Sequence, residues 1–491
     1  MSIVIESPTV ARLVGYEGRE EELRRLLRYH DKKVDFEIQK FKHSPYNLQR
    51  LGEEGFRARL DALKAERIKY LVFRDEKGLW TYSGLAHKTA LHFRDTIENK
   101  VEYPERASCP WHRVLDKEPR PYQQQAVEKL IEGRHAGVEK GTGLGKSLDI
   151  MLLAKHHGLK TIVMAPSVSI AGQLYEDFLH YFGTKNVGKF YGGKKESQKR
   201  FVIAVAASLT RVEQGSKDWE NLSQAKVFIA DESHLCPAST LLEVCFGLVR
   251  DAPYRYFFSA TQIRNDGLDL VLEGITGPIV FRMSVREGID QGYLAKPLFK
   301  MVRTKSSSSY NSRDVNNMTR KHLLYNPAVN KAAGELANKA VDLLGHSVLI
   351  LVDEIEQFSH LLPHLKHPAK FAHGGVTKDN KDSLPAEYHD SDPAALVEEF
   401  NAGKLPILVG TSCISTGTDI RAVKTMIYLM GGKSEIQVKQ AVGRCTRKVP
   451  GKDNCMVIDF DVANIESQHR HAQTRKLIYE DIYGPVAEID W

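Results

Sequence analysis

The stretch "EKGTGLGKSLDIM" at residues 139–151 has the residue types of a phosphate-binding loop. In the pattern G-x-x-x-x-G-K-[ST], glycines let backbone N–H groups turn toward phosphate oxygens, the lysine reaches the β- and γ-phosphates, and the hydroxyl holds Mg²⁺. The end of the pattern is present, but Lys140 stands at the first glycine position. Taken alone, the stretch fits a nucleotide site and a ligand-free glycine-rich turn equally well. The residues expected to hold the nucleotide are Gly141, Thr142, Gly143, Gly145, Lys146 and Ser147.

A second candidate is "KVFIADESH" at residues 226–234, an apolar run that ends in two carboxylates. A buried strand that brings paired acids beside a phosphate-binding loop suits Mg²⁺ binding by the first, Asp231, together with Ser147. The second, Glu232, could then act as general base on the attacking water. Alone, "DESH" is more often a carboxylate pair at the start of a loop. Because it follows a phosphate-binding loop, we favour the functional interpretation.

A third candidate is "QAVGRCTR" at residues 440–447, which contains two arginines three positions apart. This spacing predicts that Arg444 and Arg447 lie on one helical face and address a phosphate together. Arginine suits this role because its rigid fork of donors keeps its charge against the developing γ-phosphoryl charge. The alternative is a solvated basic helix end.

The elements that must position these residues alternate in type. "AGVEKG" can end a buried strand, and "SLDIMLLAKHH" has helical periodicity, so the loop has the strand–loop–helix order that it requires. Short β-branched runs alternate with helical segments from residue 119 onward, which indicates βαβ units and parallel sheets in two successive α/β domains. The serine-rich run at 303–313 predicts a flexible stretch near the domain boundary. The expected divisions are an N-terminal accessory domain at 1–115, domains at 119–300 and 301–465, and a helical tail at 466–491.

Composition places the chain among ordinary globular proteins. With 491 residues it should form several domains, and its net charge of +7 permits a polyanionic partner without requiring one. We find no apolar run long enough to span a bilayer and no secretory signal, so we expect an intracellular, cytoplasmic protein without a membrane partner. The six cysteines are scattered without zinc spacing.

These motifs, in this order, resemble those of superfamily 2 helicases and translocases, and the resemblance covers residues 119 to about 462. It implies two tandem RecA-like domains with ATP and Mg²⁺ between them. "RPYQQQAV" is similar to the family's Q motif, which would place Gln123 on the adenine, and "DESH" is similar to a DEAH-type motif. "SAT" at 259–261 resembles the motif that couples hydrolysis to strand movement, through Ser259 and Thr261. "LVGTSCISTGTDI" would add Asp419 to the nucleotide site, and "QAVGRCTR" would add Gln440, Arg444 and Arg447.

The same resemblance implies a set of nucleic-acid contacts. "VMAPSVSIAGQ", "AASLTR", the segment after "SAT", the "AHGG" loop at 372–375 and "LVGTS" resemble segments that hold the nucleic-acid backbone. The residues implied are Pro166, Ser167, Ser208, Arg264, Gly374 and Thr411. Contacts to phosphates imply little sequence specificity and a marked dependence on salt.

Two details resemble particular branches of the superfamily. The segment after "SAT" is similar to that of XPB-type DNA helicases, although Arg264-Asn265-Asp266 departs from their Arg-Glu-Asp element, and "STG" at 415–417 is similar to phage UvsW-type helicases. Both imply duplex, forked or branched DNA as partner rather than RNA, in a nucleoid-associated or viral-replication setting. The alternatives are an RNA helicase, or an ATP-switch or motor subunit of a larger nucleic-acid-processing or defence complex.

The accessory domain has its own hypothesis. Basic residues alternate with aromatic ones in "KYLVFRDEKGLWTYSGLAHKTALHFR" at 69–94, a composition that can hold nucleic acid. An ordinary domain with a solvated face is the equal alternative.

Overall fold

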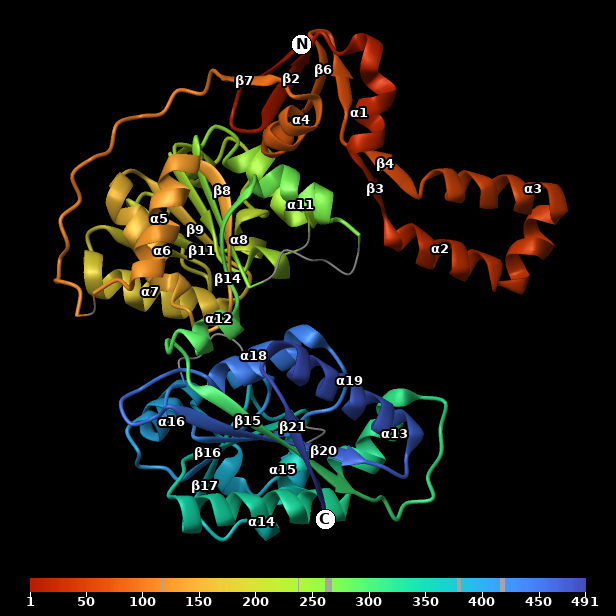
Figure 1. Cartoon of the computed structure of the whole chain (residues 1–491), viewed down its shortest axis with the longest axis vertical. Coiled ribbons are helices and arrows are strands. Elements are labelled where there is room, and N and C mark those ends of the chain that lie inside the picture. The colour runs from red at the N-terminus through yellow and green to blue at the C-terminus, as the bar shows by residue number, and fades with distance from the viewer. Residues whose placement is uncertain (117, 237, 261–266, 378–380, 416–419) are drawn as a thin grey trace. The chain divides into compact units, whose positions relative to one another are not determined.

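A computed structural model describes residues 1–491 except 117, 237, 261–266, 378–380 and 416–419 (Figure 1). The chain divides into two compact units. The first joins Met1–Lys140 with Gly145–Arg282, and the second joins Gly141–Leu144 with Met283–Trp491.

The first unit begins with a small mixed sheet in the order β5-β6-β2-β1-β7. Its strands are β1 (Ser2–Ile5), β2 (Val10–Val14), β5 (Phe73–Asp75), β6 (Gly78–Tyr82) and β7 (Thr96–Asn99), with helices α1 (Glu20–Leu26) and α4 (Ala86–Phe93). Between β2 and β5, a two-stranded ribbon of β3 (Arg28–His30) and β4 (Ile68–Tyr70) carries a helical hairpin of α2 (Lys32–Lys42) and α3 (Pro45–Ala65). The hairpin, which we call the helical arm, projects from the ribbon in Figure 1. It has its own small core around Val34, Ile38 and Leu63.

The larger sheet of the first unit has seven strands in the order β10-β11-β9-β12-β13-β8-β14. The strands are β8 (His135–Lys140), β9 (Thr161–Ala165), β10 (Val187–Phe190), β11 (Phe201–Val205), β12 (Val227–Ala230), β13 (Tyr254–Ser259) and β14 (Ile279–Met283). The helices are α5 (Pro121–Gly133), α6 (Lys146–His157), α7 (Val168–Phe182), α8 (Ala206–Leu209), α9 (Lys217–Ser223), α10 (Ala238–Glu243) and α11 (Asp269–Thr276). The next helix, α12 (Val285–Asp290), belongs to the second unit. The pairings from β10 to β8 are all parallel. β9, β11 and β12 are buried at every position, as expected of parallel strands covered by helices on both faces.

The N-terminal sheet shares a hydrophobic core with the larger sheet. Ile3 and Leu13 of the small sheet belong to the same buried cluster as Phe228 and Leu272. The ring centroids of Tyr82 and Phe246 lie 4.6 Å apart. A Cβ atom added to Gly84 would lie 2.5 Å from the carbonyl oxygen of Gly274, so the backbones approach where only glycine fits. The N-terminal sheet is therefore part of the first unit rather than an independently packed domain.

The second unit contains a seven-stranded sheet in the order β17-β18-β16-β19-β20-β15-β21, in which neighbouring strands are all parallel. The strands are β15 (Lys296–Thr304), β16 (Val348–Val352), β17 (Ala369–Ala372), β18 (Ile407–Gly410), β19 (Thr425–Leu429), β20 (Asn454–Val462) and β21 (Val486–Asp490). The helices are α13 (Val315–Thr319), α14 (Pro327–Leu344), α15 (Ile355–Leu361), α16 (Pro393–Asn401), α17 (Ser412–Ser415), α18 (Glu435–Cys445) and α19 (Glu466–Ile482). The two parallel sheets with flanking helices confirm the predicted α/β class.

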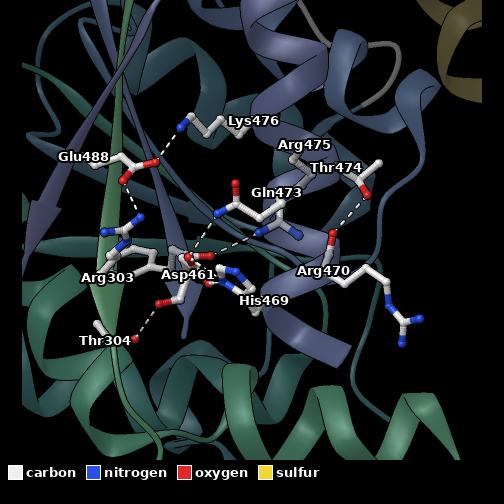
Figure 2. A network of polar contacts seen from close by, with 11 residues as sticks. Arg303, Thr304, Asp461, His469, Arg470, Gln473, Thr474, Arg475, Lys476 and Glu488 are labelled. Atoms are coloured by element: carbon white, nitrogen blue, oxygen red, sulfur yellow. Dashed lines mark hydrogen bonds and ion pairs between the residues drawn. The ribbon is translucent and has the colours of Figure 1, made fainter. Parts of the chain in front are cut away.

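The boundaries of the second unit differ from the sequence prediction. The unit begins at Met283, earlier than the expected 301, and its strand β15, which begins at Lys296, pairs with β20 and β21. The segment 466–491, expected as a helical tail, forms α19 and the edge strand β21. Figure 2 shows how polar contacts hold these elements: Glu488 of β21 pairs with Arg303 and Lys476, and His469 Nδ1 lies 2.9 Å from both carboxylate oxygens of the buried Asp461.

The prediction that residues 303–313 are flexible is wrong for the first residues of this run. Residues up to Thr304 belong to β15, and Ser306 is buried. His322, itself fully buried, lies 2.8 Å from the Ser306 hydroxyl and 2.8 Å from the Tyr310 carbonyl oxygen. A buried histidine thus holds the serine-rich run to the domain, a contact that composition cannot reveal.

Candidate functional site

The phosphate-binding loop lies between β8 and α6. Gly143 and Gly145 have φ angles of 84° and 72°, which L side chains adopt only with strain, so glycine is required at both positions. Lys146 is the first residue of α6 and is 9% exposed. Its Nζ donates to the Lys140 carbonyl oxygen at 3.3 Å and lies 2.7 Å from Glu232 Oε1. The loop lysine and the second acid are thus already in contact.

The two acids follow the buried strand β12, as predicted. Asp231 is 5% exposed, and its Oδ1 accepts a hydrogen bond from the Glu232 backbone N–H at 3.0 Å. Glu232 has a left-handed backbone with φ 45° and ψ 46°, a conformation that is uncommon for a non-glycine residue and that concentrates at functional sites. The two carboxylates have different partners: Asp231 accepts from the backbone of Glu232, and Glu232 pairs with Lys146.

Burial separates the protonation of the two acids. Desolvation, with the neighbouring Glu232 charge, raises the pKa of Asp231 to about 7. Burial alone would also raise the pKa of Glu232, but the Lys146 ammonium holds that pKa below its ordinary value. Glu232 is therefore the ionised member of the pair at neutral pH, which is the form a general base needs.

The "DESH" segment contacts the first residue of the "SAT" segment through a histidine. His234 Nδ1 lies 2.9 Å from the hydroxyl of Ser259, the last residue of β13, and 3.5 Å from Glu232 Oε2. Ser233 Oγ donates to the Phe258 carbonyl oxygen at 3.3 Å. The proposed coupling residue Ser259 is thus connected to the proposed base by one side chain. Its predicted partner Thr261 lies outside the described residues, as does Arg264.

Parallel strand order explains why these motifs meet. The strands β12, β13 and β8 are neighbours in the sheet and run in parallel, so their carboxyl ends share one edge. Lys146 follows β8, Asp231 follows β12, and Ser259 ends β13. Ligands of open parallel sheets bind at this edge. The structure therefore brings together the predicted lysine, acids and coupling serine.

Gln123, predicted to lie on the adenine, contacts the phosphate-binding loop, and its contact with the base stays a prediction. It is 4% exposed, and its Nε2 donates to the Gly145 carbonyl oxygen at 3.0 Å and to Asp149 Oδ1 at 3.2 Å. Asp149 also forms an ion pair with Lys140. Sequence reasoning missed Asp149 and His234, although an aspartate inside the apolar face of a helix was an available signal for Asp149.

The predicted nucleic-acid contacts of the first unit lie at the same edge of the sheet. Pro166 and Ser167 follow β9, and Ser208 lies in α8 directly after the neighbouring strand β11. All three side chains are partly exposed. The Ser167 hydroxyl also caps α7 by accepting from the Ile170 backbone N–H at 3.4 Å. The first backbone N–H groups of a helix have no partners within the helix, so a helix N-terminus can hold a phosphate.

In the second unit the predicted residues occupy equivalent positions. Gly374 is exposed and follows β17, while Thr411 follows the neighbouring strand β18 and donates its backbone N–H to the Ala372 carbonyl oxygen at 3.1 Å. Gln440 and Arg444 lie on α18, partly and almost fully buried respectively. The prediction that Arg447 shares their helical face was wrong, because α18 ends at Cys445 and Arg447 pairs with Leu294 in a β-bridge. Asp419 lies outside the described residues.

The phosphate-binding loop and the acids after β12 fit a nucleotide and a divalent cation. Glu232 Oε2 is buried without a hydrogen bond among the described residues, and the loop has the glycine conformations that turn N–H groups toward an anion. Ser147 and Asp231 could hold a hard cation through oxygen. Across the described residues, no group of three or more His, Cys, Asp and Glu side chains forms a metal cluster of protein ligands alone.

Within the same residues, no helix is long and apolar enough to cross a membrane.

Comparison with known proteins finds helicase families and helicase relatives. Residues 116–264 match the family described as "Type III restriction enzyme, res subunit", and residues 335–449 match the "Helicase conserved C-terminal domain". The chain is 25% identical over 419 residues to the DNA 3'-5' translocase XPB2 of Sulfurisphaera tokodaii, covering 77% of this chain and 90% of the relative. It is 21% identical over 375 residues to the ATP-dependent DNA helicase UvsW of Enterobacteria phage T4, covering 73% of this chain and 71% of the relative.

A solved structure supports the fold. Dbp5 of S. cerevisiae, bound to RNA and ADP BeF3, has a TM-score of 0.54 at 14% identity, covering 76% of this chain and 90% of that chain. The two parallel sheets, the phosphate-binding loop and the paired acids define a two-domain nucleotide-driven helicase of the RecA-like type. The chain belongs to the superfamily 2 helicases, with resemblance to their XPB and UvsW branches, and is a nucleic-acid-dependent ATPase of that superfamily.

Proposed function

We propose that this chain is an ATP-driven motor that moves on, unwinds or remodels duplex, forked or branched DNA. The observation that carries the proposal is the contact between Lys146 and Glu232, at 2.7 Å, joined through His234 to Ser259. This chain of contacts links the residue that would bind phosphate to the base and to the end of β13. A site that only stores a nucleotide needs no such link.

In the proposed mechanism, Lys146 leaves Glu232 for the β- and γ-phosphates of ATP. Glu232, which the Lys146 ammonium keeps ionised until the nucleotide binds, then accepts a proton from the attacking water. Ser147 and Asp231 would hold Mg²⁺, which neutralises phosphate charge when bound. Because burial raises the pKa of Asp231 to about 7, its carboxyl group is partly protonated near neutral pH, and a bound cation would favour the ionised form.

The nucleic-acid path is proposed along the carboxyl edges of both sheets. In the first unit, Ser167 and Ser208 follow neighbouring strands, and in the second unit Gly374 and Thr411 do the same. Backbone amides and hydroxyls of this kind bind phosphates without reading bases. DNA is preferred over RNA because the relatives XPB2 and UvsW carry DNA in their names.

The deciding experiment compares ATP turnover with single-stranded, duplex and forked DNA and with RNA at one salt concentration. We expect stimulation by DNA, strongest with duplex or forked substrates. Absence of stimulation by any DNA would refute the motor. Greater stimulation by RNA would instead support the alternative RNA helicase.

The roles of Gln440, Arg444 and Arg447 in hydrolysis stay proposals. Arg444→Lys keeps the charge but removes the bidentate fork, so it should reduce turnover if the arginine addresses phosphate. The matched control is Arg421→Lys, because Arg421 is exposed and lies outside the motif. Equal turnover of both variants and wild type would remove Arg444 from the mechanism.

We also propose that the helical arm binds nucleic acid. The aromatic residues of 69–94 that suggested this role are partly committed to packing, since the ring centroids of Phe73 and Trp80 lie 4.4 Å apart and Tyr82 packs on Phe246. The arm instead exposes Phe36 (72%) and Tyr46 (64%). Its exposed basic residues on α2 are Lys32, Lys33, Lys40 and Lys42.

Substitution tests the arm better than deletion, because the N-terminal sheet shares a core with the larger sheet. Changing the four α2 lysines to alanine should weaken DNA binding and flatten the salt dependence by about 0.9 per lost phosphate contact. Lys331→Ala and Lys339→Ala on α14 are the matched controls. An unchanged Kd and salt slope for the arm variant would exclude this role.

A further inference from the structure

A buried ion pair occupies the place where the phosphate-binding pattern has its first glycine. Lys140, the last residue of β8, and Asp149, in the first turns of α6, are both 0% exposed and form a hydrogen-bonded ion pair. The Lys140 ammonium also lies 4.8 Å from the ring centroid of Tyr122. Buried charges require partners, so each residue explains the presence of the other.

Gln123 connects this pair to the loop. Its Nε2 donates to Asp149 Oδ1 at 3.2 Å and to the Gly145 carbonyl oxygen at 3.0 Å, and its Oε1 accepts from the Arg120 backbone N–H at 3.1 Å. A primary amide has two N–H donors, and both are used in these contacts. A Cβ atom added to Gly145 would lie 2.7 Å from Gln123 Nε2, so the amide packs directly on the loop.

We infer that Gln123, held by the buried Lys140–Asp149 pair, is a positioning residue for the phosphate-binding loop rather than a reader of the nucleobase. The inference rests on the proposed nucleotide site. Gln123 fixes the carbonyl of Gly145, the residue directly before Lys146, and therefore sets the direction in which the loop presents its N–H groups and lysine. Asp149 holds one N–H of the amide, and Lys140 balances the charge of Asp149.

Burial disfavours the charged form of both partners, and their ion pair offsets only part of that cost. Burial lowers the pKa of Lys140 and raises the pKa of Asp149 to about 6. Removing either partner leaves the other without compensation in the core. Replacing both by apolar residues leaves no uncompensated charge in the core, but it removes the hydrogen-bond acceptor of Gln123 on α6.

The two roles of Gln123 predict different responses to the base. If Gln123 positions the loop, Gln123→Ala weakens every ligand that the loop holds by phosphate, whatever its base. If it reads adenine, the same change weakens adenine nucleotides only. The probes are ADP, GDP and inorganic tripolyphosphate, each with Mg²⁺, titrated calorimetrically into the full chain without nucleic acid.

We expect Gln123→Ala to raise Kd by about tenfold for ADP and by the same factor, within about twofold, for GDP and tripolyphosphate. Gln125→Ala is the matched control, because this neighbouring glutamine is exposed. A rise for ADP with unchanged tripolyphosphate binding would overturn the inference. The readout omits DNA, so its result is separate from whether DNA stimulates turnover.

The ion pair is tested in the same assay. Lys140→Met alone should lower the Tm and raise Kd, whereas Lys140→Met with Asp149→Leu should recover the Tm but keep the raised Kd. In the Gln123→Ala background, the double change should raise Kd no further, because the amide through which it acts is gone. Full recovery of Kd in the double variant, or an additive loss in the triple variant, would contradict the positioning role.

Discussion

Lys146 Nζ lies 2.7 Å from Glu232 Oε1, so the phosphate-binding lysine and the proposed general base form an ion pair inside the first unit. This pair explains how Glu232 stays ionised although it is largely buried, because the ammonium offsets the cost of desolvation. It also means that nucleotide binding must exchange one partner of the lysine for another. Variants of Glu232 therefore affect the lysine as well as the base.

Glu232→Gln should abolish turnover without abolishing nucleotide binding. An amide cannot accept the proton of the attacking water, so kcat should fall by about 10²–10⁴. The lysine loses its competing carboxylate, and the Kd for Mg-ADP should stay the same or decrease. Phosphate release and calorimetry measure the two quantities. The exposed Glu213→Gln is the control, and a Glu232→Gln variant with near-normal kcat would remove Glu232 as the base.

Ser259→Ala should weaken the link between hydrolysis and nucleic acid. The change removes the hydroxyl that lies 2.9 Å from His234 Nδ1. We expect the ratio of DNA-stimulated to basal turnover to fall by about fivefold, since one hydrogen bond is worth about 1 kcal/mol. The Kd for nucleotide should be unchanged. A raised nucleotide Kd with an unchanged stimulation ratio would show instead that the serine supports binding.

Arg475→Leu should destabilise the second unit. Arg475 is 2% exposed, and its guanidinium donates to both carboxylate oxygens of Asp459 at 2.8 Å and to the Gly432 carbonyl oxygen at 2.8 Å. Removing one partner of a buried pair costs about 3–5 kcal/mol. Hydrogen exchange of β20 and α19 should accelerate accordingly. Arg470→Leu, exposed on the same helix, should change stability by less than about 0.5 kcal/mol. Similar exchange rates in the two variants would contradict this prediction.

The stability of the first unit should fall in acid partly because of His157. Its ring is 2% exposed and its Nε2 lies 2.8 Å from the Tyr256 hydroxyl. Burial lowers the pKa of His157 to about 3, whereas an unfolded histidine titrates near 6.5, so the unfolded chain binds the proton first. This contribution to the unfolding free energy is fully present above pH 6.5 and is lost as pH falls toward 3. At pH 5 the loss is about 2 kcal/mol.

Unfolding by urea between pH 8 and pH 5 measures this dependence. His157→Phe should show a shallower loss of unfolding free energy than wild type, even if it is less stable at pH 8. His180→Phe, a change at an exposed histidine on α7, should keep the wild-type slope. An unchanged slope in His157→Phe would show that this histidine does not carry the dependence.

Much of the fold and part of the site could be predicted from local patterns. The alternation of apolar runs and helical periodicity predicted two parallel sheets, because strands buried on both faces must be apolar throughout. The glycines of the loop and the acids after β12 could be predicted from the sequence because their spacing is set by the local backbone. The helical-face argument for Arg447 failed because one helix end lay two residues earlier than the pattern suggested.

The sequence by itself determined which residues can do chemistry: the loop from Gly141 to Ser147, the acids Asp231 and Glu232, and their order along the chain. Only the tertiary structure decided what they contact. Lys140 stands at an unusual position in the sequence, but its partner Asp149 and the commitment of Gln123 to the loop follow from side-chain burial. The physical reason is that spacing encodes local geometry, whereas the pairing of buried charges depends on which surfaces the fold brings together and removes from water.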